Sequence, residues 1–157
     1  MLISQQLKLV VITIETETMH FIMLNSKIFR NTQIYLDKVI KKYELSSGSF
    51  LYLISLEKNE GISQNKLSEE IGHDKAMSAR TIKKLIDLGY VYKEQHESNS
   101  RAYRLYLTEK AKDILPEIHE KIQEMVTLFT EELTEEELLI TMRSLKKIFN
   151  STNKFRE

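Results

Sequence analysis

The sequence predicts a mainly α-helical fold with one small β-hairpin, on three observations. The 157 residues include one proline and four glycines, so little interrupts long helices. Apolar residues recur at helical spacing over most of the chain. Two runs rich in β-branched or aromatic residues, 90–94 and 103–107, alternate in polarity and flank the polar segment 95–102, which predicts two strands joined by a loop.

Residues 1–19 do not share the pattern of the chain that follows, and we expect an N-terminal extension of unknown role. The apolar side chains from Leu7 to Ile14 could form a strand, but the threonines and glutamates after them offer no evident partner. A loosely attached tail and an arm or added strand at a subunit interface both fit. The apolar run is short and lacks a small-residue cleavage site, so neither a signal peptide nor a membrane span is expected.

A long helix should come next, followed by a shorter one. From His20 to Tyr43, apolar residues recur mostly at helical spacing. Ser46 or Ser47 can then cap a second helix, whose apolar run ends at Gly61.

Two further helices are separated by a short turn. Ser63 can cap a helix over residues 64–71, and a tight turn at 72–74 follows it. Asp74 can cap the next helix, which Gly89 ends. A helix, a tight turn, a second helix and a hairpin, in this order, predict a winged helix-turn-helix.

The C-terminal part should be helical again. Thr108 can cap a long helix that runs to about Thr130, with Pro116 expected to kink or break it. Thr134 and Glu137 have the spacing of a capping box at the start of a last helix.

The apolar positions of the terminal helices exceed what one small winged helix-turn-helix could cover. We therefore expect a homodimer in which terminal helices of two subunits interleave, with a monomeric helical bundle as the alternative. The expected organisation is an extension at 1–19, an N-terminal dimerisation helix at 20–45, a winged helix-turn-helix DNA-binding domain at 46–107 and C-terminal helices at 108–157 that complete the dimerisation domain.

The charge distribution is neutral overall but locally polarised. The chain has 23 basic and 23 acidic residues, so bulk charge does not predict nucleic-acid binding. Residues 62–107 carry eight lysines and arginines against six acidic residues, whereas five glutamates cluster within 131–137. A chain polarised in this way could dock on a polyanion by one face.

The helix after Asp74 has one side that can pack and one that can face DNA. Ser78, Ile82 and Leu85 share the first side, and the opposite side is basic. Side chains on a helix that enters the major groove read base edges, while phosphates attract cations regardless of sequence. The candidate DNA-binding residues of this helix are Lys75, Ala76, Met77, Arg80, Thr81, Lys83 and Lys84.

The hairpin loop supplies a second candidate surface, made of Asn99, Ser100 and Arg101. An arginine at the tip of such a loop is suited to a narrow minor groove. The alternative, for these residues and for Lys83 and Lys84, is that the charges only keep the surface soluble.

Six segments occur in a fixed order, and together they are more specific than any one of them. They are Leu67-Ser68-Glu69-Glu70-Ile71-Gly72, Asp74-Lys75-Ala76, Arg80, Ile82-Lys83-Lys84-Leu85, Gly89-Tyr90-Val91 and Arg101-Ala102-Tyr103-Arg104-Leu105-Tyr106-Leu107-Thr108-Glu109-Lys110. Over residues 20–149 the chain thereby resembles the MarR family of bacterial and archaeal transcriptional regulators.

The resemblance implies a homodimer that binds a pseudo-palindromic operator in double-stranded DNA, usually as a repressor. It implies a recognition helix in each major groove and a wing arginine in the adjacent minor groove, roles that fall on Arg80 and Arg101. Many members release DNA when a small, often phenolic, anion binds between the dimerisation and DNA-binding parts. A small aromatic or anionic effector is thus implied, without an identified site.

Two positions depart from the family pattern. Asn99 stands where an acidic residue commonly braces the wing arginine, and Ser78 stands where a valine usually anchors the recognition helix. The Ser78 hydroxyl therefore needs a partner. Four aromatic residues fit either an effector pocket or an ordinary core: Tyr35, Tyr43, Phe50 and Tyr52.

Other classes of protein are less well supported. The histidines share no catalytic spacing, and no phosphate loop or nucleophile motif occurs, so neither an enzyme nor a cofactor is expected. A metal-responsive regulator using His20, His119 and Glu120 or Glu124 is one alternative, and a winged helix that binds protein is another. The absence of cysteine excludes disulfides, and we expect a cytoplasmic protein that does not bind membranes.

Overall fold

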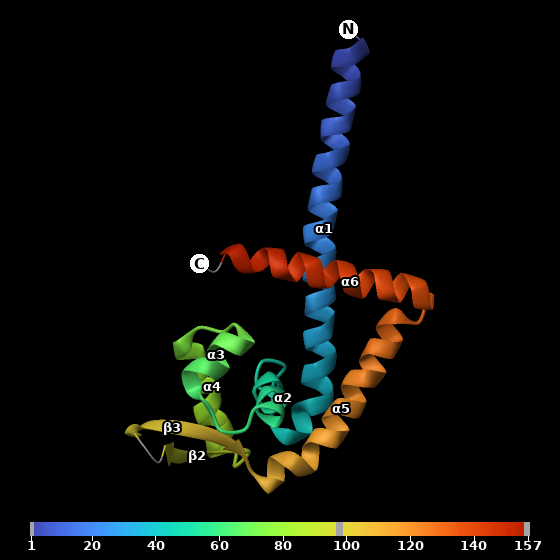
Figure 1. Cartoon of the computed structure of the whole chain (residues 1–157). Coiled ribbons are helices and arrows are strands. Elements are labelled where there is room, and N and C mark those ends of the chain that lie inside the picture. The colour runs from blue at the N-terminus through green and yellow to red at the C-terminus, as the bar shows by residue number, and fades with distance from the viewer. Residues whose placement is uncertain (1, 97–98, 156–157) are drawn as a thin grey trace. The chain divides into compact units, whose positions relative to one another are not determined.

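The computed structural model describes the backbone of residues 2–96 and 99–155, and the side chains of residues 17–95, 103–152 and 154–155. The chain divides into two compact units, Met1–His119 and Glu120–Glu157. The helices and strands, in order, are α1 (Leu2–Ile40), η1 (Lys41–Tyr43), α2 (Phe50–Lys58), β1 (Ile62–Ser63), α3 (Gln64–Ile71), α4 (Lys75–Asp87), β2 (Val91–His96), β3 (Asn99–Leu107), α5 (Glu109–Thr130), α6 (Glu135–Thr152) and η2 (Asn153–Phe155) (Figure 1). This mainly helical fold with one small sheet confirms the predicted fold class.

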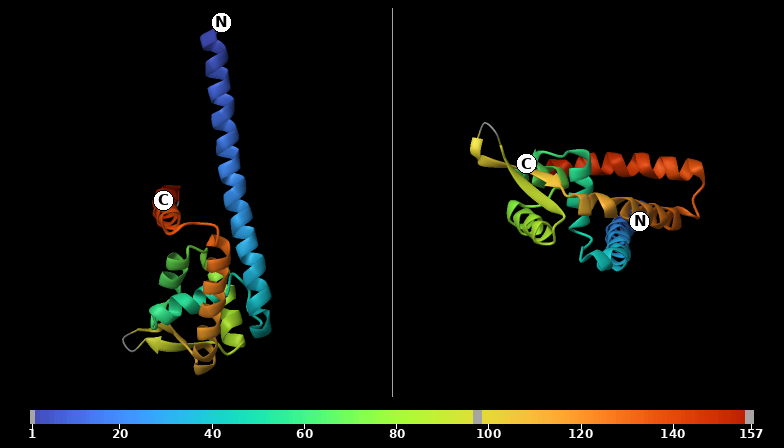
Figure 2. Two further views of the ribbon diagram at one scale, coloured as in Figure 1. Left: turned by 90° about the vertical axis from the view of Figure 1, so that its right-hand side faces the viewer. Right: turned by 90° about the horizontal axis from the view of Figure 1, so that it is seen from below.

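Helix α1 is longer than predicted and takes in the N-terminal extension. It runs without interruption from Leu2 to Ile40, so the strand considered between Leu7 and Ile14 is wrong. Extending an existing helix adds a hydrogen bond for each residue ordered, whereas a strand there would need a partner. Within its unit, α1 projects as one rod well beyond the small helices that follow it (Figure 2).

The sheet has three antiparallel strands in the order β1-β3-β2. Its hairpin confirms the two predicted strands, which are longer than expected because β2 continues to His96 and β3 starts at Asn99. The third strand, β1, was not predicted. It pairs Ile62 with Leu105 and Ser63 with Arg104, and two residues are too few to show an alternating pattern.

The core of the first unit lies where α2, α3 and α4 meet the sheet and the start of α5. Apolar side chains from all of these elements are almost fully buried there: Tyr52, Leu53, Leu56, Leu67, Ile82, Leu85, Leu105, Leu107, Leu115 and Ile118. This burial holds the two helices of the helix-turn-helix against the base of the hairpin.

The predicted helix caps are mostly confirmed. Ser63 Oγ accepts a hydrogen bond from the Lys66 amide at 3.3 Å, and the Thr134–Glu137 capping box is present, with the Thr134 amide 2.9 Å from Glu137 Oε2. The prediction that Ser46 or Ser47 caps α2 is wrong. Ser49 occupies that position because a turn at Ser46 delays the helix: the Ser46 carbonyl accepts from the Ser49 and Phe50 amides.

Helix α5 continues through Pro116, so of the kink or break that the sequence predicts, the break does not occur. A proline removes one amide donor, and the loss is offset here by the flanking Leu115 and Ile118, whose side chains are buried. Thr108 caps this helix as predicted, since its Oγ1 accepts from the Ala111 amide at 3.2 Å.

Candidate nucleic-acid interface

Helix α4 begins at a capped N-terminus. The Met77 amide donates to Asp74 Oδ1 at 2.8 Å. This bond, a weaker one from the Ala76 amide and the nearby positive charge of Arg80 hold the pKa of Asp74 below its ordinary value. The cap satisfies an amide that would otherwise lack a partner in the first turn of the helix.

The two sides of α4 separate as the sequence predicts. Ser78, Ile82 and Leu85 are buried. Of the seven residues predicted to contact DNA, Thr81 is half-buried and the others are exposed: Lys75, Ala76, Met77, Arg80, Lys83 and Lys84. The outward side is therefore accessible to a polyanion, and contact of each residue with DNA stays a prediction.

Lys83 makes an ion pair within α4. Its Nζ lies 2.8 Å from Asp87 Oδ2, and both side chains are mostly exposed. An exposed pair of this kind contributes little free energy, so Lys83 can exchange Asp87 for a phosphate at small cost.

The inward side of α4 contains a polar contact. Tyr52 Oη on α2 donates to Ser78 Oγ at 2.9 Å, and the same oxygen lies 3.0 Å from Nδ1 of His73. The hydroxyl of Ser78 thus has the partner that its burial requires. Tyr52 is buried in the core, as is Phe50. Tyr43 Oη donates to Glu117, a bond that raises the pKa of Tyr43.

The C-terminal end of α4 is attached to the start of α5. The Leu88 carbonyl accepts from Lys110 Nζ at 2.7 Å, and the Gly89 carbonyl accepts from Thr108 Oγ1 at 2.7 Å. Lys110 also lies over the ring of Tyr90, with Nζ 4.4 Å from the ring centroid. A structural role for Lys110 was not predicted from the sequence. The signal that could have indicated one is its place in the segment 101–110, which carries the resemblance to the MarR family.

The wing is the β2–β3 hairpin. Asn99, Ser100 and Arg101 lie on β3, and their side chains fall outside the described residues. Nearer its base, Arg104 Nη1 donates to the Gly61 carbonyl at 2.7 Å. This bond joins the wing strand to the chain entering β1.

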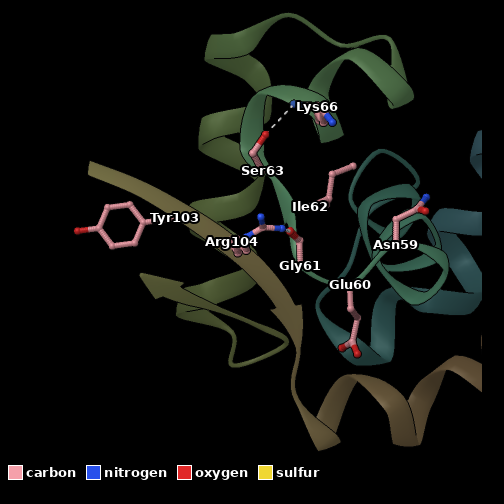
Figure 3. Close-up of a pocket in the computed structure, with 8 residues that line it drawn as sticks. All are labelled: Asn59, Glu60, Gly61, Ile62, Ser63, Lys66, Tyr103 and Arg104. Carbon is pink, nitrogen blue, oxygen red and sulfur yellow. Dashed lines mark hydrogen bonds between the residues drawn. The ribbon is translucent and has the colours of Figure 1, made fainter. Parts of the chain in front are cut away.

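A cavity of about 470 Å³ opens at the base of the wing, between β1, β3 and the start of α3. Its lining residues are Asn59, Glu60, Gly61, Ile62, Ser63, Lys66, Tyr103 and Arg104 (Figure 3). Figure 3 shows Arg104 directed toward Gly61 and the ring of Tyr103 directed away from the other lining residues. The Glu60 carboxylate accepts from the Leu107 amide at 3.0 Å and lies 3.7 Å from Lys112 Nζ, so its charge is already compensated.

The metal-responsive alternative finds no support in the side chains that the structure describes. His119 Nε2 lies 2.7 Å from Glu57 Oε2, in an exposed contact between α5 and α2. No group of three or more histidine, aspartate or glutamate side chains that could hold a metal ion occurs among the described residues. Over the same part of the chain, no helix has both the length and the apolar character needed to cross a bilayer.

A capped helix with an exposed basic side, preceded by a short helix and a tight turn and followed by a hairpin, defines a winged helix-turn-helix protein. The model of the MarR family matches residues 45–103. The HTH-type transcriptional regulator BilQ of Clostridioides difficile (strain CD3) is 36% identical over 105 residues, covering 67% of this chain and 70% of that protein. The chain belongs to the MarR family of transcriptional regulators, and neither its fold nor its relatives are those of an enzyme.

Crystal structures of similar proteins share the fold. A MarR transcriptional regulator from Methanosarcina mazei Go1 is 34% identical, with a TM-score of 0.77 over 83% of this chain and 94% of that one. A putative MarR family regulator from Listeria monocytogenes, complexed with a 26mer DNA, is 28% identical, with a TM-score of 0.76 over 81% of this chain and 85% of that one.

Proposed function

We propose that this chain binds a pseudo-palindromic DNA operator as a homodimer and represses transcription. The observation that carries the proposal is helix α4, whose buried side is fixed to the core while its basic side is exposed. The Listeria monocytogenes regulator that shares this fold was crystallised with DNA, which supports the same use of the fold here.

Within this proposal, different side chains of α4 and the wing contact different parts of the DNA. Arg80 reads a guanine or grips a phosphate, because its planar guanidinium can donate two parallel hydrogen bonds to either. Lys83 and Lys84 contact phosphates as flexible point charges. Ala76 and Met77 touch thymine methyl groups, and Arg101 enters the adjacent minor groove from the wing.

The dimer is proposed from apolar surface that each unit leaves uncovered. Helix α1 exposes large apolar side chains on every side: Met19, Phe21, Ile22, Met23, Leu24, Ile28, Phe29 and Ile34. Helix α6 exposes a second set: Leu139, Ile140, Met142, Leu145, Ile148 and Phe149. A helix that is apolar all round is normally buried, so residues 20–45 and 108–157 are assigned to a dimerisation domain.

Two parts of the proposal rest on the family alone. Repression is the usual action of MarR regulators, and release by a small aromatic or anionic effector is common among them. A thermal-shift screen with phenolic acids tests the second part: an effector should raise the melting temperature, and above its Kd the rise should follow the logarithm of its concentration.

The test of DNA binding is selection from random-sequence duplexes, followed by a mobility-shift assay. The selected duplex should bind the wild-type protein with an affinity that falls steeply between roughly 50 and 200 mM salt. Arg80→Ala should weaken this binding by about 1 to 3 kcal/mol. Arg143→Ala, which removes the same charge from α6, is the matched control and should bind as the wild type does.

Failure to select any duplex at low salt would contradict the proposal. It would favour a winged helix that binds protein, for which no steep dependence on salt through released counterions is expected.

A further inference from the structure

Tyr52 on α2 contacts the recognition helix and the turn before it through one atom. Its Oη donates to Ser78 Oγ at 2.9 Å and lies 3.0 Å from His73 Nδ1. Tyr52 and Ser78 have no exposed surface. A phenol has one hydrogen to donate and can also accept, so with its hydrogen given to Ser78 the oxygen can accept another from His73.

Ser78 and Arg80 lie on opposite sides of α4. Residues two apart are separated by about 200° around a helix axis. Any rotation of α4 that carries Ser78 one way therefore carries Arg80 the other way across the outward surface. Helix geometry therefore links the position of the buried Ser78 hydroxyl to the direction of the exposed Arg80 guanidinium.

The other inward residues constrain this rotation less. Ile82 and Leu85 hold α4 by apolar burial, which is non-directional and tolerates small displacements. The hydrogen bond of Ser78 is directional and weakens steeply when its angle is lost. Because a buried hydroxyl without a partner is costly, the orientation of α4 in which Ser78 reaches Tyr52 is selected over neighbouring ones.

We propose that Tyr52 is a positioning residue for operator recognition. The Tyr52 hydroxyl sets the rotation of α4 about the helix axis without contacting DNA. That rotation determines the direction in which the Arg80 side chain points. The inference rests on the proposed function. Non-specific binding depends on charge, whereas specific binding needs side chains placed on base edges, so the Tyr52 hydroxyl should matter for the operator and not for unrelated DNA.

The test is a double-mutant cycle with Tyr52→Phe, Ser78→Ala and the double variant, on the duplex selected by the wild-type protein and on an unrelated duplex. Circular dichroism checks that each variant is folded at the assay temperature. Each single variant should bind the operator about tenfold more weakly and the unrelated duplex unchanged. The double variant should lose no more than either single variant, because both remove the same bond.

Tyr90→Phe is the matched control. Tyr90 is buried and its hydroxyl donates to the Tyr43 carbonyl at 3.0 Å, so the variant loses a tyrosine hydroxyl bond that does not involve α4. It should be less stable than the wild type but bind the operator equally well. If Tyr52→Phe does not fold, Ser78→Ala provides the same comparison.

Three results would overturn the inference alone: wild-type operator affinity in folded Tyr52→Phe, an equal loss on both duplexes, or single losses that multiply in the double variant. A wild-type protein that selects no duplex overturns the proposed function instead, and the inference with it.

Discussion

Arg104 Nη1 on β3 donates to the carbonyl of Gly61 at 2.7 Å, and this bond joins the wing strand to the chain that enters β1. Asn99 stands where members of this family commonly have an acidic residue that braces the wing, and we expect bracing at the base to matter more here. Arg101 lies three residues before Arg104 on β3, beyond the register shift that follows the Gln95–Tyr103 pair. We therefore expect a small change in the direction of the strand at its base to cause a larger displacement at Arg101, the residue proposed to enter the minor groove.

Arg104→Ala should weaken operator binding while leaving the protein folded. The variant loses the bond to Gly61 and with it one restraint on the direction of the wing. The operator affinity of Arg104→Lys should lie between those of the wild type and Arg104→Ala, because an ammonium keeps the charge but lacks the planar guanidinium fork. Fluorescence anisotropy with the selected duplex measures the effect. Equal affinities for the alanine variant and the wild type would show that the wing does not depend on this contact.

Lys84→Ala should reduce the dependence of DNA affinity on salt. Each phosphate contact releases counterions, so the slope of log affinity against log salt should become shallower by about 1. Lys147→Ala on α6 removes the same charge elsewhere and should leave the slope unchanged. A titration over several salt concentrations gives both slopes, and an unaltered slope for Lys84→Ala would remove this residue from the interface.

The charge of Asp74 should contribute to stability in a pH-dependent way. Amide hydrogen bonds from Met77 and Ala76 and the charge of Arg80 lower the pKa of Asp74 in the folded protein. A lowered pKa means that the contribution is fully present above the ordinary value of 3.8 and is lost as pH falls through the lower folded value.

Melting curves of the wild type and of Asp74→Asn between neutral pH and pH about 2 test this sign. Asparagine can still accept the capping bond but does not titrate, so the difference between the two proteins should shrink on acidification. If the stability difference between the wild type and Asp74→Asn stays constant or grows on acidification, the lowered pKa of Asp74 in the folded protein is contradicted.

Leu145→Glu should disrupt the proposed dimer. Leu145 is one of the large apolar side chains that α6 exposes, and a glutamate in a buried interface would be costly. Light scattering at micromolar concentration should give twice the 18.5 kDa chain mass for the wild type and the chain mass for the variant. Lys147→Glu introduces the same residue at a polar position and should remain dimeric. A monomeric wild type would refute the dimer.

Features that depend on neighbouring residues were predictable from sequence. Ser63, Asp74, Thr108 and the Thr134–Glu137 pair cap their helices as expected, because a cap needs only a polar side chain two or three residues before the amide it accepts from. The two-sided character of α4 was predictable for the same reason, since helical spacing sets which residues share a side.

The sequence by itself determined most of the helices, though not the first half of α1, together with the hairpin, the outward basic side of α4 and the resemblance to the MarR family. Only the tertiary structure decided that Tyr52 meets Ser78, that Arg104 meets Gly61, that β1 joins the sheet and that α2 starts after Ser49. Each of these except the last joins residues distant in the chain. A hydrogen bond between distant residues depends on how the helices and strands pack, and no local pattern of residues encodes that packing.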